Sequence, residues 1–100
     1  MYRQGDVMVE ACAVPDGAKR VEAEAGRLIL ARGEATGHHH SLVADAETDL
    51  YERDGVLYLR LAGVKVLEHQ EHAPITLPPG DYRVARQVEY NPEEIRRVQD

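Results

Sequence analysis

All five histidines of this 100-residue chain fall in two short segments. The first segment is His38, His39 and His40, and the second contains His69 and His72. On a strand, His38 and His40 point to one face and His39 to the other, so two imidazoles are presented together. Neutral imidazole binds zinc at about 2.0–2.1 Å and also suits copper, nickel and iron. The pattern therefore indicates a site for a divalent transition metal, with zinc as the first choice.

The ligands that we predict for this metal are His38, His40, His69 and His72. Four protein ligands would make the site structural, whereas three ligands and a water would leave a position for Lewis-acid chemistry. Glu68 and Glu71 flank the second segment and could ligate the metal, accept a ring N–H or act as a base. The alternative is that the two segments never meet and that these are solvated turn histidines. Burying four imidazoles without partners would be costly, so their convergence would point to a metal or an anionic ligand.

Arg86 is the second candidate for chemistry, because it interrupts an apolar strand face. The other members of that face, by alternation, are Tyr82, Val84, Val88 and Tyr90. An inward guanidinium needs a partner, and a glutamate is the simplest one. Alternatively, Arg86 is an anion clamp that would form, with His38 and His40, an enzyme site for an anion or nucleotide without a metal. The sequence does not decide whether the protein is an enzyme, and Arg86 and Glu71 are candidate catalytic residues.

The composition is typical of one small globular domain, and we predict a single domain over residues 1–100. Hydrophobic residues are 43% and charged residues 30% of the chain. No apolar run approaches the ~20 residues that cross a bilayer, and a net charge of −6 disfavours binding to nucleic acid or an anionic membrane. The start of the chain lacks a secretory signal and the lone Cys12 cannot form an internal disulfide, so a cytoplasmic protein is expected.

Apolar and polar residues alternate with period two through much of the chain, which predicts strands, for example over residues 6–14 and 82–90. Short strands joined by turns predict an all-β fold, a small antiparallel sandwich or barrel that could be a jelly roll. The chain has no Trp and no Phe, so its core must be mainly aliphatic. Asn91-Pro92-Glu93-Glu94 is typical of a helix start, which predicts a short C-terminal helix through Gln99.

Turn residues divide the predicted strands. Asp54-Gly55 separates two alternating runs and predicts a tight hairpin. Residues 64–69 are expected to form a second hairpin with the strand before them. Pro74 cannot donate to a central ladder, so residues 73–77 are predicted to form an edge strand. Residues 15–26 are predicted to be a loop or one weak helical turn.

Two resemblances accompany these patterns. The H-x-H pair of His38 and His40, with the Pro78-Pro79-Gly80 turn, resembles the cupins, and that resemblance implies a jelly roll with a metal site. Arg83 stands where the cupin pattern has a further histidine, and the acidic ligand expected after H-x-H is not clearly placed. The chain also resembles a family of short uncharacterised bacterial proteins, which implies no known activity. The stretches that carry this second resemblance are TGHHH (36–40), EHAPITLPPGDY (71–82) and RQVEY (86–90).

A different class of function is a non-enzymatic interaction module, either a subunit of a larger assembly or a self-associating protein. Its docking element would be the C-terminal helix or an exposed edge strand. The small size of the chain and the lack of a convincing nucleophile favour this alternative. Ser41 beside His40 does not form a nucleophile–base pair, because adjacent strand residues point to opposite faces.

Overall fold

The computed structural model describes residues 1–33 and 37–87, and the described residues form ten β-strands and no helix. The strands are β1 (Tyr2–Gln4), β2 (Val7–Ala11), β3 (Lys19–Arg20), β4 (Arg27–Arg32), β5 (His39–Val43), β6 (Thr48–Arg53), β7 (Val56–Leu61), β8 (Lys65–Leu67), β9 (Ile75–Leu77) and β10 (Gly80–Arg86). All of their pairings are antiparallel. The predicted all-β, antiparallel fold is therefore confirmed for this part of the chain.

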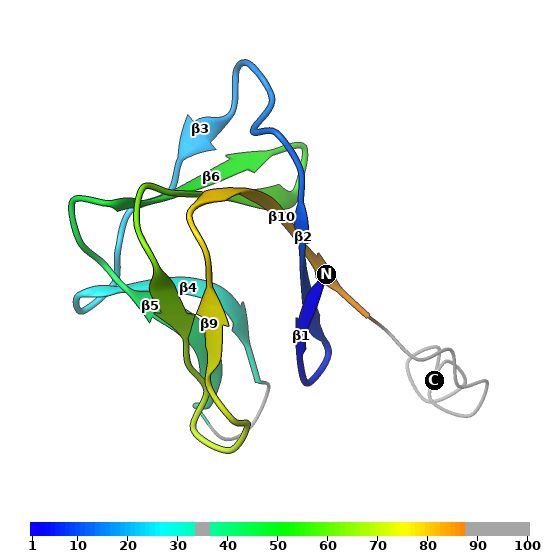
Figure 1. Cartoon of the computed structure of the whole chain (residues 1–100), viewed down its shortest axis with the longest axis vertical. Coiled ribbons are helices and arrows are strands. Elements are labelled where there is room, and N and C mark those ends of the chain that lie inside the picture. Colours follow the sequence, from blue (N-terminus) through cyan, green and yellow to red (C-terminus); the bar gives the residue numbers. More distant parts are fainter. Residues whose placement is uncertain (34–36, 88–100) are drawn as a thin grey trace, which may run out of the picture.

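The strands form one large sheet and two small ribbons (Figure 1). The six-stranded sheet has the order β1-β2-β10-β7-β6-β3, while β4 pairs with β5 and β8 pairs with β9. Within residues 1–33 and 37–87, no helix is long and apolar enough to cross a membrane. The helix predicted from Asn91 lies outside the described residues, as do Val88 and Tyr90.

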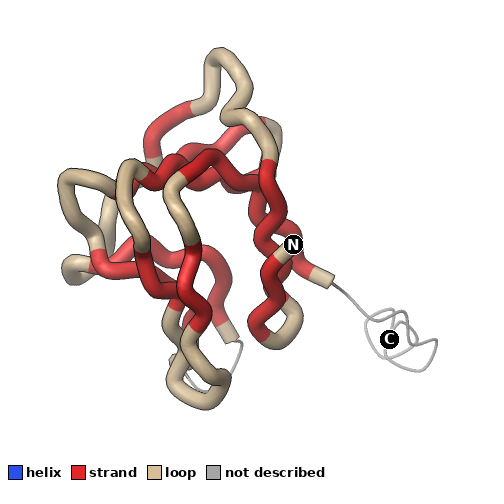
Figure 2. The backbone as a smooth tube through the Cα atoms, in the orientation of Figure 1, coloured by secondary structure: helices blue, strands red, loops and turns tan. Residues whose placement is uncertain are grey.

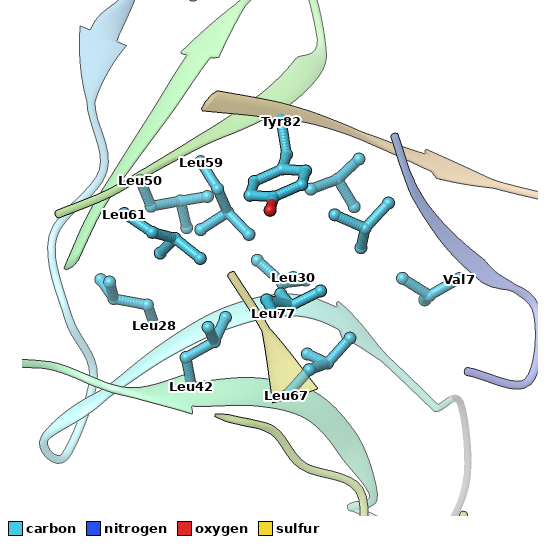
Figure 3. Packing of buried hydrophobic residues seen from close by; sticks show 12 residues of the cluster. Val7, Leu28, Leu30, Leu42, Leu50, Leu59, Leu61, Leu67, Leu77 and Tyr82 are labelled. Carbon is cyan, nitrogen blue, oxygen red and sulfur yellow. The ribbon is translucent and has the colours of Figure 1, made fainter. Parts of the chain in front are cut away.

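One apolar core lies between the six-stranded sheet and the two ribbons (Figure 3). Its buried members come from eight strands: Val7, Val9, Leu28, Leu30, Leu42, Leu50, Leu59, Leu61, Leu67, Leu77, Tyr82 and Val84. Leucine predominates, as expected for a chain without Phe and Trp. Full burial of one such side chain contributes about 1.5–3 kcal/mol, so this shared core holds the two ribbons against the sheet.

The Asp54-Gly55 hairpin is confirmed. Arg53 pairs with Val56 at the end of the β6–β7 ladder, which leaves a two-residue loop. Both loop residues have positive φ, 52° at Asp54 and 80° at Gly55. This is the left-handed backbone that a tight hairpin turn requires, and aspartate followed by glycine adopts it with little strain.

The predicted hairpin of residues 64–69 is wrong. β8 does not form a hairpin with β7 but pairs with β9, because both edges of β7 are already occupied by β6 and β10.

Residues 15–26 form the predicted loop rather than the alternative helical turn, and the loop contains the two-residue strand β3, which pairs with β6. The segment has only Ala and Val to bury, too little for a helix to dock. The edge-strand prediction for residues 73–77 agrees with β9, which is hydrogen-bonded only to β8.

The ribbons are joined to one another and to the sheet at one end of the molecule. Ser41 of β5 and Glu68 form an isolated bridge with N···O distances of 3.0 and 2.9 Å. On the other side, the Gln4 side chain donates to the carbonyls of Leu67 and Ala73, both at 2.9 Å. The β8–β9 loop and the β1–β2 turn consequently lie at the same end, at the bottom of Figure 2.

Candidate functional site

Four of the five histidines meet at this end of the molecule, and we call them the histidine cluster: His38, His40, His69 and His72. The His69 ring is central, with its centroid 4.3 Å from that of His40, 4.7 Å from His72 and 5.6 Å from His38. The centroids of His40 and His72 are 5.9 Å apart. The structure thus brings together the two segments that the sequence analysis singled out.

The start of β5 supplies the first half of the cluster. His40 points inward and is only 4% exposed, and His38 lies on the same side, against His69. His39 points the other way, where its Nδ1 is 2.9 Å from Ser41 Oγ. The predicted alternation along this strand is therefore confirmed, although His39 still lines one pocket with His69.

The β8–β9 loop supplies the second half, His69 and His72. The Ser41–Glu68 bridge fixes the start of this loop beside β5. The His72 ring then packs on the β1–β2 turn at Gly5, where an added Cβ would lie 2.7 Å from His72 Nε2. Gly5 also has a φ of +59°, so both the backbone and the close ring favour glycine here.

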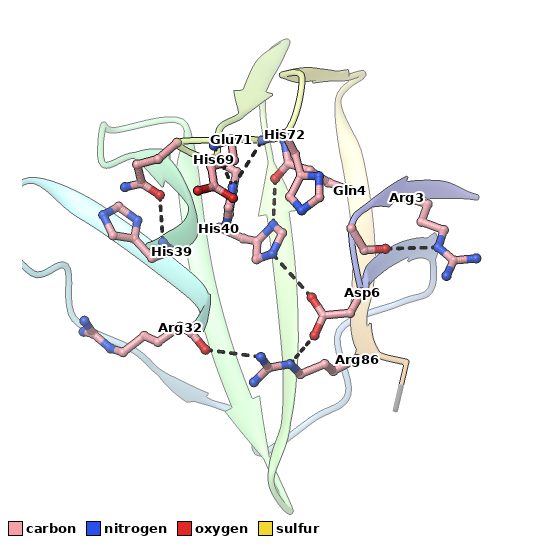
Figure 4. Close-up of polar contacts among 12 residues, drawn as sticks. Arg3, Gln4, Asp6, Arg32, His39, His40, His69, Glu71, His72 and Arg86 are labelled. Carbon is pink, nitrogen blue, oxygen red and sulfur yellow. Dashed lines mark hydrogen bonds and ion pairs between the residues drawn. The ribbon is translucent and has the colours of Figure 1, made fainter. Parts of the chain in front are cut away.

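Gln4 sets the tautomer of His40 (Figure 4). Its amide nitrogen donates to two carbonyls, so its Oε1 must be the atom that lies 2.8 Å from His40 Nδ1. An amide oxygen only accepts, so His40 Nδ1 carries a proton. The Nε2 atom of the neutral ring then holds the lone pair. This is the arrangement of a metal-ligating histidine whose other nitrogen is held by a second residue.

His69 has the opposite tautomer. The backbone N–H groups of Glu71 and His72 both point at its Nδ1, at 3.0 and 3.3 Å. Nδ1 is therefore the acceptor, and the neutral ring carries its proton on Nε2. To ligate a metal through Nε2, the His69 ring must give up these two backbone hydrogen bonds.

Asp6, from the β1–β2 turn, lies beside His40. Its Oδ1 is 3.5 Å from His40 Nε2, and its Oδ2 accepts a hydrogen bond of 2.6 Å from Arg86 Nε. This hydrogen bond from Arg86 is the main cause of the lowered pKa of Asp6. Asp6 is therefore ionised at neutral pH.

The predictions for Arg86 were partly wrong. Its side chain is about half exposed, at 49%, rather than pointing into the core, because it lies at the end of β10. Its partner is Asp6 and not a glutamate, and it also donates to the Arg32 carbonyl at 3.2 Å. Arg86 thus borders the cluster through Asp6.

The two glutamates of the second segment lie on different sides. Glu71 Oε1 is 3.4 Å from His38 Nδ1 at the rim of the cluster. Glu68 instead accepts from Arg27 at 2.8 Å, and Arg27 also donates to Ser41 Oγ. Glu71 is therefore the glutamate placed to act on the cluster, whereas Glu68 is engaged by Arg27.

Burial and neighbouring imidazoles favour the neutral form of two of the rings, His40 and His69. Burial lowers the pKa of His40 below its usual 6.5, and charge on His69 and His72 would lower it further, while Asp6 opposes this shift. The pKa of His69 is also lowered, by burial first and then by the neighbouring His72 and His38. Neutral imidazoles with lone pairs are the form that binds a metal.

The lowered pKa of His40 makes the metal-free protein sensitive to acid. The unfolded chain, with its histidine pKa near 6.5, binds more protons than the folded protein between that value and the lower folded pKa. Stability is therefore complete above about pH 6.5 and falls as the pH drops through this window, by up to ~1.4 kcal/mol per pH unit for one proton. Denaturant unfolding between pH 7.5 and 5 measures the slope, and His40→Gln should flatten it. A slope that this variant leaves unchanged would contradict the assignment.

Among the described residues, no group of three or more His, Cys, Asp or Glu side chains is arranged so that it could hold a metal ion. The described residues also contain no buried side-chain N or O atom without a hydrogen-bond partner. The cluster is thus a set of satisfied side chains close to one another, and some rings must turn before three of them can ligate one ion.

The fold and the cluster define a small antiparallel β protein with four histidines gathered at one end. The model of the family described as Domain of unknown function (DUF8820) matches residues 3–87, and the chain belongs to this family. This agrees with the uncharacterised family expected from the sequence. No curated protein and no solved structure matches the chain.

Sequence reasoning missed Gln4 and Asp6, which complete the site. Both belong to the first strand and turn, far along the chain from the histidines. The sequence offered one signal for Gln4, because it is a polar residue directly before a Gly-Asp turn. In the structure its side chain is buried, at 3% exposed. Asp6 carried none that distinguishes it from an ordinary turn aspartate.

Proposed function

We propose that this protein binds a divalent transition metal ion, zinc in the first place, at the histidine cluster. The observation that carries the proposal is the approach of four imidazoles from two distant segments, in which each ring centroid lies 4.3–5.9 Å from that of at least one other. If these positions only filled space, leucine would be expected there, because leucine predominates in this core. Imidazoles are the favoured nitrogen ligands of zinc and also suit copper, nickel and iron.

The proposed ligands are His38, His40, His69 and His72. His40 is the best prepared, because Gln4 holds its Nδ1 and leaves the Nε2 lone pair available. His69 is the least prepared, because its Nδ1 accepts two backbone hydrogen bonds. All four ligands together would make a structural site. Three ligands would leave one position for Lewis-acid chemistry, with Glu71 at the rim as the candidate base.

Zinc loading tests this function. Protein purified without a nickel column and then stripped with a chelator should gain thermal stability when zinc is added. At a free zinc concentration of 100 times Kd, the gain is about 2.7 kcal/mol. The gain should shrink below about pH 6.5, where protons compete for the imidazoles. The proposal fails if zinc, copper, nickel and iron(II) all leave the melting temperature unchanged at pH 7.5.

We also propose that the sheet and the two ribbons make one small sandwich or barrel, as a jelly roll would. The shared core, the Ser41–Glu68 bridge and the Gln4 side chain support this description, because together they link all three sheets. The proposed setting is the cytoplasm, a reducing compartment in which a lone Cys12 stays a thiol.

The second candidate function is an interaction module, with a second copy of this chain as the simplest partner. It is favoured by exposed valines next to the β5–β8 junction: Val43 is 52%, Val64 62% and Val66 43% exposed. Size-exclusion chromatography with light scattering tests it. A monomer at all concentrations, unchanged by Val66→Asp, would contradict self-association through this surface.

A further inference from the structure

We infer that Asp6 is a ligand of the metal and shares it with His40 Nε2. This inference rests on the metal-binding function proposed above and adds a carboxylate that the histidine pattern does not contain. Two further residues position this pair: Gln4, which contacts His40 Nδ1, and Arg86, which donates to Asp6 Oδ2.

The separation of the two donor atoms supports shared coordination. Zinc ligands lie at about 2.0–2.1 Å for nitrogen and 2.0–2.2 Å for oxygen, so two ligands at a tetrahedral angle are about 3.3–3.5 Å apart. His40 Nε2 and Asp6 Oδ1 are 3.5 Å apart. The two atoms are therefore already at ligand spacing, whereas the other rings must turn to reach the same ion.

The nature of the two atoms supports it as well. Gln4 fixes the proton of the neutral His40 ring on Nδ1, so Nε2 is an acceptor. Asp6 Oδ1 is a carboxylate oxygen and also an acceptor. Two acceptors that face each other repel, and a cation between them turns this repulsion into attraction.

Each of the two proposed ligands is also hydrogen-bonded to a second residue through the atom that does not face the metal, as in many metal sites. Gln4 Oε1 lies 2.8 Å from His40 Nδ1, and Arg86 Nε lies 2.6 Å from Asp6 Oδ2. These contacts fix the orientation of the imidazole and of the carboxylate, and removal of such supporting contacts typically lowers metal affinity 10–100-fold. The same turn places Gly5 against the His72 ring, so a third donor lies next to the pair.

The test compares two aspartates that each pair with an arginine. Zinc affinity of the full chain is measured by competition with a chromophoric chelator for the wild type, Asp6→Asn and Asp81→Asn. Asp6→Asn keeps the size of the side chain and should weaken zinc binding at least about tenfold. Asp81→Asn, which changes the carboxylate 3.2 Å from Arg60 Nε, should stay within about twofold. Equal affinity of the wild type and Asp6→Asn would overturn the inference.

A second measurement avoids any substitution. In the cobalt(II)-loaded wild type, the NMR signals of the Asp6 side chain should show a larger paramagnetic shift than those of Glu71. Larger shifts at Glu71 than at Asp6 would also overturn the inference. If the wild type binds neither zinc nor cobalt, the proposed function itself fails. If it binds them and only Asp6 is unaffected, the function stands and Asp6 is merely the ion-pair partner of Arg86.

Discussion

Replacement of His40 by alanine should lower zinc affinity at least a hundredfold, equivalent to ~2.7 kcal/mol. His40 is the buried member of the cluster and the one whose lone pair is set by a neighbour, through Gln4. Loss of its imidazole also removes the Nε2 lone pair that faces Asp6. Chelator competition on the purified variant measures the loss.

His39→Ala is the matched control for His40→Ala. It removes an adjacent imidazole from the same strand, but one on the opposite face, where its Nδ1 contacts Ser41 Oγ. Its zinc affinity should remain within about twofold of the wild type. Equal losses in the two variants would mean that binding depends on the number of histidines in the segment and not on the cluster. Circular dichroism of the zinc-free variants confirms that both fold.

Gln4→Leu should lower the free energy of unfolding by about 3 kcal/mol. The amide makes three hydrogen bonds at a position that is 3% exposed, to Leu67, Ala73 and His40. A leucine fills a similar volume but leaves these partners without the amide, at about 1–3 kcal/mol for each group that water cannot reach. Denaturant unfolding of the zinc-free protein measures the difference.

Two further variants sharpen this result. Gln87→Leu changes an exposed glutamine and should alter stability by less than about 0.5 kcal/mol. Gln4→Glu can still accept from His40 Nδ1 but cannot donate to the carbonyls of Leu67 and Ala73, so it should lose most of the same stability. If Gln4→Leu were as stable as the wild type, Gln4 would not be what ties the β8–β9 loop to β1.

The local features of the fold could be predicted because their causes lie within a few residues. Asp54-Gly55 predicts its hairpin through backbone conformation alone, and the structure has both residues at positive φ. The alternation of His38, His39 and His40 predicts their faces in the same way. Pro74 predicts the edge position of β9 because it lacks a donor.

The long-range features could not be predicted, because no local signal specifies their partners. Proximity in sequence predicts that β8 pairs with β7, but that edge of β7 is occupied by β10, which comes later in the chain. The many glutamates predict a glutamate partner for Arg86, yet it pairs with Asp6, which is 80 residues away. Gln4 reaches Ala73 across 69 residues. The histidines of the site could therefore be predicted from their residue type and spacing. The residues that orient them could not.

Crystals of the zinc-loaded protein, measured on both sides of the zinc absorption edge, test the central claim most directly. We expect one strong anomalous peak at the end of the molecule where the β8–β9 loop meets the β1–β2 turn, about 2.0–2.1 Å from His40 Nε2. Density maps that show no peak within bonding distance of His40, or that place the imidazoles of His40 and His72 apart in solvent, would contradict it.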